Sequence, residues 1–172
     1  MAKTDAFFIR AQVTSNSANF TEASIDLGAF VDALGKSVLR IHSISAQITD
    51  ETSAGQQLIL TAGTSEQLCW QLTTQSQSAM LTFEDKSVVA GAVYNIANTS
   101  TAVGLTDFVE IGDRVDQQWS KGYLVGVEQM YLGCEGGGVD LSSGNVNFTL
   151  IMECTVETLT ANAAMALSLS QQ

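Results

Sequence analysis

Residues 146–156 alternate strictly enough between apolar and polar side chains to constrain the whole fold. The apolar positions are Val146, Phe148, Leu150, Met152, Cys154 and Val156, and the polar positions between them include Asn147, Thr149, Glu153 and Thr155. Successive side chains of a β-strand point to opposite faces, so this period of two predicts an antiparallel strand with one buried and one wet face. A sheet with one apolar face needs a second layer to cover it.

Shorter segments repeat this pattern along the chain. Residues 38–48 form a run rich in β-branched residues, and Leu68, Trp70 and Leu72 share one face of another short stretch. We therefore predict two more strands there and place Trp70 in the core. Further strands are expected at residues 7–13, 20–25, 57–62, 79–83, 104–111 and 123–132, separated by turn-rich segments such as 50–55 and 136–138.

Many short strands with little room for crossover helices predict an all-β fold. We expect an antiparallel two-sheet sandwich, a single jelly roll, with at most one or two short helices. An immunoglobulin-like sandwich stays open at this point, because strand order is a long-range property. The 172 residues suit a single domain spanning residues 1–172.

Two segments could be helical. Residues 27–34 could form two helical turns, with Gly35 as the residue that closes them. In residues 163–169 the alanines favour a helix with Thr160 as its N-cap, whereas Met165, Leu167 and Leu169 alternate at strand period. A terminal strand could pair with a neighbouring subunit, so residues 160–172 are a candidate C-terminal arm.

The charge balance excludes several partners. The chain carries 18 acidic and 7 basic residues, a formal net charge of -11, so its field repels nucleic acid and anionic lipid. It has no apolar run long enough for a transmembrane segment and no apolar signal core near residue 1, so we expect a soluble protein. The chain has fewer charged residues than an ordinary globular protein and is rich in Ser, Thr and Gln instead. An uncharged polar surface of this kind suits burial against other protein.

The residues offer little catalytic chemistry. His42 is the only histidine, and its neighbour Ser43 points to the opposite face of a strand, so we expect a structural histidine and no enzyme. Cys69, Cys134 and Cys154 are odd in number and widely spaced, which indicates reduced, apolar cysteines and no cofactor.

The loops rich in side-chain oxygen atoms could bind a metal ion. Asp113, Asp116, Glu135 and Asp140 are candidate calcium ligands, although their spacing matches no EF-hand loop. Paired loop carboxylates could also serve a small glycoside-cleaving enzyme if two of them met across a cleft.

Trp119 lies in the polar segment 116–122 before a predicted strand. A tryptophan in such a loop is either an anchor in an interface or a plug that fills the loop. It could instead stack on a sugar, so the alternative function is a carbohydrate-binding, lectin-like β-sandwich that uses Trp119 and nearby acids, with or without calcium.

Two regions of the chain resemble a known family. The first region has a predicted strand, Lys36-Ser37-Val38-Leu39-Arg40-Ile41, which follows the segment Ser24-Ile25-Asp26-Leu27-Gly28-Ala29-Phe30-Val31. The second region has a Gly-rich loop and the strand at 146–156, which follow the segments Tyr123-Leu124-Val125-Gly126-Val127 and Met130-Tyr131-Leu132-Gly133. This arrangement resembles the single-jelly-roll major capsid proteins of tailless icosahedral viruses of archaea and bacteria, of the internal-membrane type.

The resemblance implies a structural viral capsid protein that self-assembles into an icosahedral shell. Its partners would be further copies of itself and other capsid proteins, in homo- or hetero-oligomeric capsomers. The protein would be located in the virion and would be made in the host cytoplasm. The chain lacks a basic N-terminal arm, so we expect no direct binding of nucleic acid, in agreement with an internal membrane beneath the shell. We predict that Trp119, Met165, Leu167 and Leu169 contact neighbouring subunits.

Overall fold

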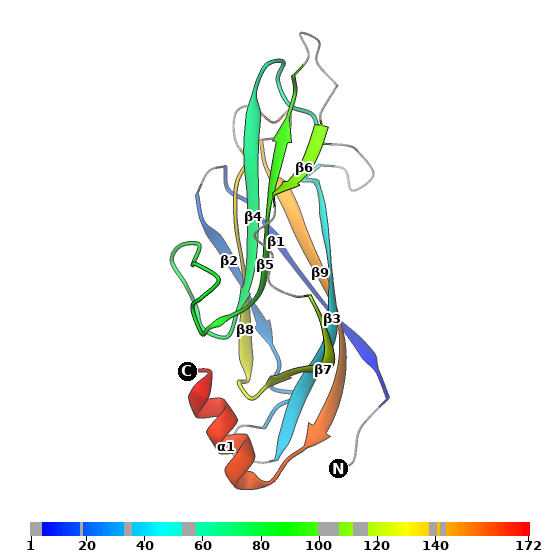
Figure 1. The fold of residues 1–172 in the computed structure, drawn as a ribbon, viewed down its shortest axis with the longest axis vertical. Helices are drawn as coiled ribbons and strands as arrows, with labels where there is room; N and C mark the ends of the chain where they lie inside the picture. The colour runs from blue at the N-terminus through cyan, green and yellow to red at the C-terminus, as the bar shows by residue number, and fades with distance from the viewer. Residues whose placement is uncertain are drawn as a thin grey trace.

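The computed structural model describes residues 5–17, 19–32, 36–52, 58–99, 107–111, 117–137, 141 and 144–172. It is a two-sheet β-sandwich with one helix at the C-terminus (Figure 1). The elements are β1 (Phe7–Thr14), β2 (Thr21–Asp26), β3 (Ser37–Asp50), β4 (Ser65–Thr73), β5 (Val88–Ala97), β6 (Asp107–Ile111), β7 (Gln118–Val125), β8 (Gln129–Glu135), β9 (Val146–Thr158) and α1 (Ala161–Ser170).

The strand order identifies the sandwich as a jelly roll. One sheet has the order β1-β9-β3-β7 and the other β2-β8-β4-β5-β6, with antiparallel pairing throughout. Apart from β6, these are the two four-stranded sheets of a double Greek key. In an immunoglobulin sandwich the first two strands share a sheet, whereas β1 and β2 lie in different sheets here. The predicted jelly roll is therefore confirmed.

Strand β9 is one of the two central strands of the four-stranded sheet, and it is the strand that the alternating pattern predicts. It lies between β1 and β3, and its pairing with β3 runs from Ser37 opposite Thr158 to Asp50 opposite Val146. The inward residues Val146, Phe148, Leu150, Met152 and Cys154 are buried.

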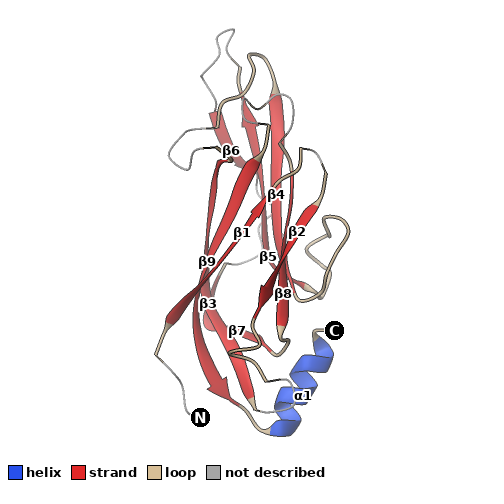
Figure 2. Ribbon diagram, turned by 180° about the vertical axis from the view of Figure 1, so that it is seen from behind, coloured by secondary structure: helices blue, strands red, loops and turns tan. Residues whose placement is uncertain are grey.

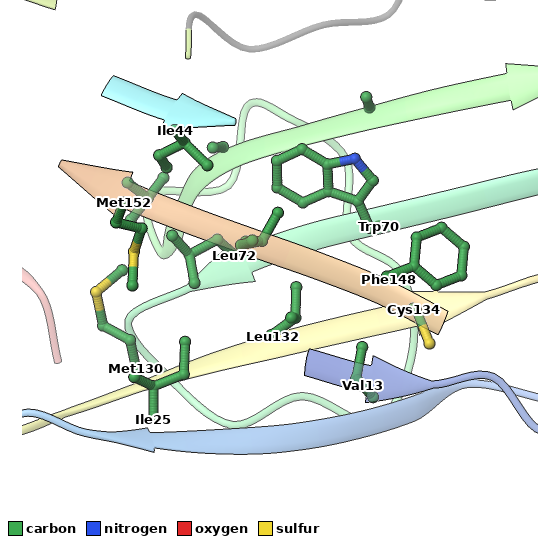
Figure 3. Close-up of a cluster of buried hydrophobic side chains, with 14 of the residues drawn as sticks. Val13, Ile25, Ile44, Trp70, Leu72, Met130, Leu132, Cys134, Phe148 and Met152 are labelled. Carbon is green, nitrogen blue, oxygen red and sulfur yellow. The ribbon is translucent and has the colours of Figure 1, made fainter. Parts of the chain in front are cut away.

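Side chains from both sheets meet in one core. Figure 3 shows Trp70 and Leu72 of β4, Phe148 and Met152 of β9 and Leu132 of β8 among them. Trp70 is fully buried, as predicted, and so are Cys134 and Cys154. Burying large aromatic and aliphatic side chains is the main stabilising contribution in such a fold.

Several predicted elements differ in the structure. Residues 79–83 form a loop rather than a strand, because the side chain of Gln71 hydrogen-bonds to the backbone of this segment. The side-chain oxygen of Gln71 accepts from Leu81 N at 2.8 Å, and its side-chain nitrogen donates to Ala79 O at 3.2 Å. In the predicted strand 57–62, the described residues contribute only a single β-bridge, from Leu60 to Leu141. The sequence pattern does not predict strand β5, because its small residues show no alternation.

Two predicted continuous segments are also corrected. The strand expected at 123–132 is two strands, β7 and β8, which part at Gly126 and enter different sheets. The helix expected at 27–34 is a single turn closed by Val31 N to Leu27 O at 2.9 Å, and Gly35 lies outside the described residues.

Candidate assembly surface

Helix α1 settles the alternative that the sequence leaves open at residues 163–169. The hydroxyl of Thr160 accepts a hydrogen bond from Ala163 N at 3.3 Å, and Thr160 itself keeps an extended backbone, as an N-cap residue does. The segment is helical, so it cannot donate a strand to a neighbouring sheet. Its alanines and its cap outweigh the alternation of its large side chains.

The helix turns large apolar side chains towards solvent. Met165 is 54% exposed and Leu169 is 65% exposed, and because these residues are four apart they lie on one face. We call Met165 and Leu169 the α1 face. Leu167 points the other way and is half-buried, with its Cγ atom 3.0 Å from where a Cβ on Gly126 would lie. Of the three predicted contact residues on the helix, two are therefore free to meet a partner.

Gln171 attaches the end of the helix to the sandwich. Its side-chain oxygen accepts from Gly126 N at 2.8 Å, and its side-chain nitrogen donates to Leu124 O at 2.7 Å and to the Tyr123 hydroxyl at 3.3 Å. Its backbone carbonyl accepts from the Thr74 hydroxyl at 2.9 Å. This residue is nearly buried, yet nothing in the sequence signals it, since a polar residue near a terminus usually indicates a solvated tail.

Trp119 lies in strand β7, so the predicted loop position is wrong. It is half-buried and packs against the core, and its ring centroid is 5.7 Å from that of Tyr123. The Tyr123 hydroxyl in turn accepts from Gln171. Trp119 and α1 are thus linked through two residues along the β7 edge of the four-stranded sheet, although they come from distant parts of the chain.

A further exposed apolar side chain lies on β1, and no sequence pattern marks it. Phe8 is 57% exposed, and the Arg10 guanidinium carbon lies 5.9 Å from the centre of its ring. Because Phe7, Ile9, Ala11 and Val13 contact the core, Phe8 and Arg10 point outward. They lie next to Glu153 and Ile151 of β9, which pair with them in register. We call Phe8, Arg10, Ile151 and Glu153 the β1 patch.

His42 has a structural position. It is the extra residue of a β-bulge in β3, half-buried, with its Nε2 atom 3.0 Å from the Thr155 hydroxyl. The Ser43 hydroxyl instead donates to Glu153 at 3.2 Å. The serine and the histidine therefore have separate partners and form no nucleophile and base pair.

Arg40 and Glu157 form a two-pronged ion pair between β3 and β9. Arg40 Nε and one terminal nitrogen each donate to a carboxylate oxygen of Glu157 at 2.7 Å, and the other terminal nitrogen donates to Lys121 O. The hydrogen bond to Glu157 raises the pKa of Arg40. The pair and the bond to Lys121 link three strands, β3, β9 and β7. The Glu157 side chain is fully buried and that of Arg40 is only 15% exposed, so the pair is not accessible to a substrate.

The cysteines are not reactive groups. Burial raises the pKa of Cys69 to about 11 and those of Cys134 and Cys154 to about 12, with smaller contributions from neighbouring glutamates. A thiol with so high a pKa is protonated at neutral pH and is a poor nucleophile and metal ligand.

Three of the four candidate calcium ligands lie outside the described residues. Asp113, Asp116 and Asp140 lie outside the described residues, and Glu135 ends β8. Within the described ranges, no three His, Cys, Asp or Glu side chains gather as metal ligands would. Those ranges also contain no helix with the length and apolar character needed to cross a bilayer.

A polar groove of about 630 Å³ lies beside the C-terminal end of α1. Its lining residues include two carboxylates, an aromatic ring and several amides and hydroxyls: Asp26, Thr74, Gln75, Ser76, Glu128, Gln129 and Tyr131. Trp119 is not among the residues that line it, so the groove and the tryptophan do not form one sugar-stacking platform.

Comparison with known proteins finds similarity in structure alone. The chain is similar to a solved structure of Desmodium yellow mottle tymovirus (TM-score 0.34, 11% identity, 90% of this chain and 87% of that chain covered) and to one of turnip yellow mosaic virus (TM-score 0.31, 13% identity, 91% and 97% covered). It is also similar to Merkel cell polyomavirus VP1 as an unassembled pentamer (TM-score 0.39, 7% identity, 88% and 96% covered). No protein-family model matches the sequence, and no curated protein matches it.

Proposed function

We propose that this protein is the structural subunit of a self-assembling viral shell. The observation that carries the proposal is the α1 face, an exposed apolar surface on a helix without charge. Residues 158–172 contain no Asp, Glu, Lys or Arg, although the chain as a whole carries a net charge of -11. Two copies repel each other at a distance, so a stable contact between them needs an uncharged surface that can be desolvated at low cost.

The jelly roll suits this role because it presents surfaces on many sides. The outward residues of the four-stranded sheet include the exposed, uncharged side chains of Gln12, Ser45 and Gln47. Such a face can be covered by protein without burying unpaired charge. It matches the uncharged polar surface that the sequence composition indicates.

The more detailed proposal follows the resemblance of the sequence to single-jelly-roll capsid proteins. We propose an icosahedral virion of the tailless, internal-membrane type, with capsomers of this chain alone or with other capsid proteins, made in the host cytoplasm. In this role the protein is not an enzyme and does not contact the packaged nucleic acid directly. The net charge of -11 supports the last point, because it repels phosphate.

Four residues are proposed to form or support the contacts with neighbouring subunits. Met165 and Leu169 would contact the neighbour directly, because both are exposed. Leu167 and Trp119 are half-buried against their own domain, so their direct share of the contact is smaller.

Light scattering with negative-stain electron microscopy tests the proposal. We expect the purified protein to form rings, sheets or shells, and to form more of them as added salt screens the repulsion between copies. The double variant Met165→Glu and Leu169→Glu should stay monomeric while folding normally. Ser65→Glu, an added charge at an exposed position of the other sheet, is the matched control. A wild-type protein that stays monomeric at every salt concentration would contradict the proposal.

The groove beside α1 favours a second candidate, binding of a neutral carbohydrate. Asp26 and Glu128 could accept hydrogen bonds from sugar hydroxyls, and Tyr131 offers an aromatic ring. Calorimetric titration against a panel of oligosaccharides tests this function. Binding that Tyr131→Ala abolishes, in a protein that remains monomeric, would favour it over shell assembly, and the absence of binding would remove it.

A further inference from the structure

We infer that the α1 face of one copy docks on the β1 patch of a second copy of this chain. The inference rests on the proposed function and names the two surfaces that meet. It assigns Phe8, an exposed residue of β1, to an interface between copies.

The first argument is the position of the exposed apolar side chains. Phe8, Met165 and Leu169 are the large apolar residues exposed in the described part of the chain. Phe8 lies on β1 and the other two lie on α1, which contacts β7. Because β1 and β7 are opposite edges of the four-stranded sheet, one chain cannot cover its own patch with its own helix. Figure 2 shows α1 well apart from the N-terminal end of β1.

The second argument is charge. The α1 face belongs to a segment without charged residues, and the β1 patch contains one cation, Arg10, and one anion, Glu153. Neither surface therefore adds to the repulsion between two copies that each carry a net charge of -11.

The third argument is the chemistry of the groups that would meet. A methionine thioether makes favourable contacts with an aromatic ring, and Met165 and Phe8 supply these two groups. Exposed Leu169 adds aliphatic surface to the α1 face, and half-buried Ile151 adds some to the β1 patch. Since exposed apolar patches on soluble proteins commonly mark interaction sites, two such patches of matching chemistry are explained by one contact.

The contact would be heterologous, because two different surfaces meet. Each copy then offers its α1 face to one neighbour and its β1 patch to another, so contacts continue from copy to copy and close into a ring when the rotation between copies allows it. The simplest alternative is an isologous pair in which two helices pack on each other. That arrangement leaves Phe8 exposed.

Engineered cysteines distinguish these arrangements. We would prepare Phe8→Cys, Met165→Cys and the double variant, oxidise them at neutral pH and separate them on a non-reducing gel. The native thiols interfere little, because burial raises their pKa values to about 11 and about 12. We expect a ladder of covalent multimers from the double variant, dimers from a mixture of the two single variants, and monomers from each single variant alone.

A double variant with Phe8→Cys and Gln67→Cys is the matched control, since Gln67 is exposed on β4 of the other sheet. Efficient self-dimerisation of Met165→Cys alone would overturn the inference in favour of paired helices. Wild-type shells whose double variant assembles but forms no ladder would overturn it while leaving the proposed function intact. A wild-type chain that never assembles would instead remove the proposed function itself.

Discussion

The side-chain oxygen of Gln171 accepts a hydrogen bond from the backbone N–H of Gly126 at 2.8 Å, and this contact attaches the C-terminal end of α1 to the segment between β7 and β8. Only Ala164 and Ser168 of the helix are buried, so apolar packing contributes little to its docking. The side-chain hydrogen bonds of Gln171 to Leu124 and Tyr123, and the bond from the Thr74 hydroxyl to its backbone carbonyl, strengthen this attachment. Loss of one side chain should therefore release the whole helix.

We predict that Gln171→Ala undocks α1 without unfolding the sandwich. The buried N–H of Gly126 would lose its partner, at a cost of about 1–3 kcal/mol. Hydrogen exchange followed by mass spectrometry should show faster exchange in residues 161–170 only, and assembly should weaken. Gln172→Ala is the control, because residue 172 is exposed and its backbone carbonyl, which accepts from Lys86, is kept. Unchanged exchange in Gln171→Ala would show that the helix is held by other contacts.

The ion pair between Arg40 and Glu157 should dominate the polar contribution to stability. Glu157→Gln leaves the Arg40 charge without its counterion in a nearly buried site, so we expect the free energy of unfolding to fall by about 3–5 kcal/mol. Urea denaturation measures this change. Glu153→Gln, four residues away on β9 and half-buried, should cost less than about 1 kcal/mol. Equal costs for the two variants would contradict this interpretation.

A side chain at Gly122 should destabilise the fold, for two separable reasons. Its φ angle is +73°, which disfavours other residues, and a Cβ there would lie 2.5 Å from Arg40 Cγ. Gly63 has nearly the same φ angle, +76°, with no atom within 4 Å of its Cβ position. Gly63→Ala should cost about 1–2 kcal/mol for the backbone alone.

Gly122→Ala should cost clearly more than Gly63→Ala, because it also displaces the side chain that pairs with Glu157. Thermal melting of the two variants measures the difference. Similar melting temperatures would mean that Arg40 moves aside freely and that the ion pair adapts to the added methyl group.

The buried thiols should make the protein sensitive to alkaline pH. In the unfolded chain they ionise near the ordinary pKa of 9.0, whereas in the folded protein those of Cys134 and Cys154 remain protonated to about 12. The raised pKa values therefore contribute stability that is complete below pH 9 and is lost as the pH rises from about 9 towards about 12.

Urea midpoints measured between pH 7.5 and pH 10.5 test this dependence. The midpoint of the wild type should fall over this range, and the double variant Cys134→Ala and Cys154→Ala should start lower but fall less steeply. Identical slopes for the two proteins would show that other groups, such as Tyr123, cause the loss.

Much of the sandwich follows from the sequence alone, because side-chain alternation is a local property. The pattern at residues 146–156 predicts β9 and its buried face, and the same reasoning places Trp70 in the core. The net charge and the uncharged C-terminal segment are likewise read directly from the residues. Alternation fails at β5, whose small residues are buried without showing a period of two.

Only the tertiary structure decides which distant residues meet. Strand order separates a jelly roll from other sandwiches, and it depends on pairings such as Ser37 with Thr158 that join residues far apart in the chain. The hydrogen bond between Gln171 and Gly126 likewise follows from that order. So does the placement of Phe8 on one edge strand, β1, and of Met165 on the helix that contacts the opposite edge strand, β7. Local patterns determine which residues can form strands, whereas the closing of long loops between them determines the surfaces that the molecule presents.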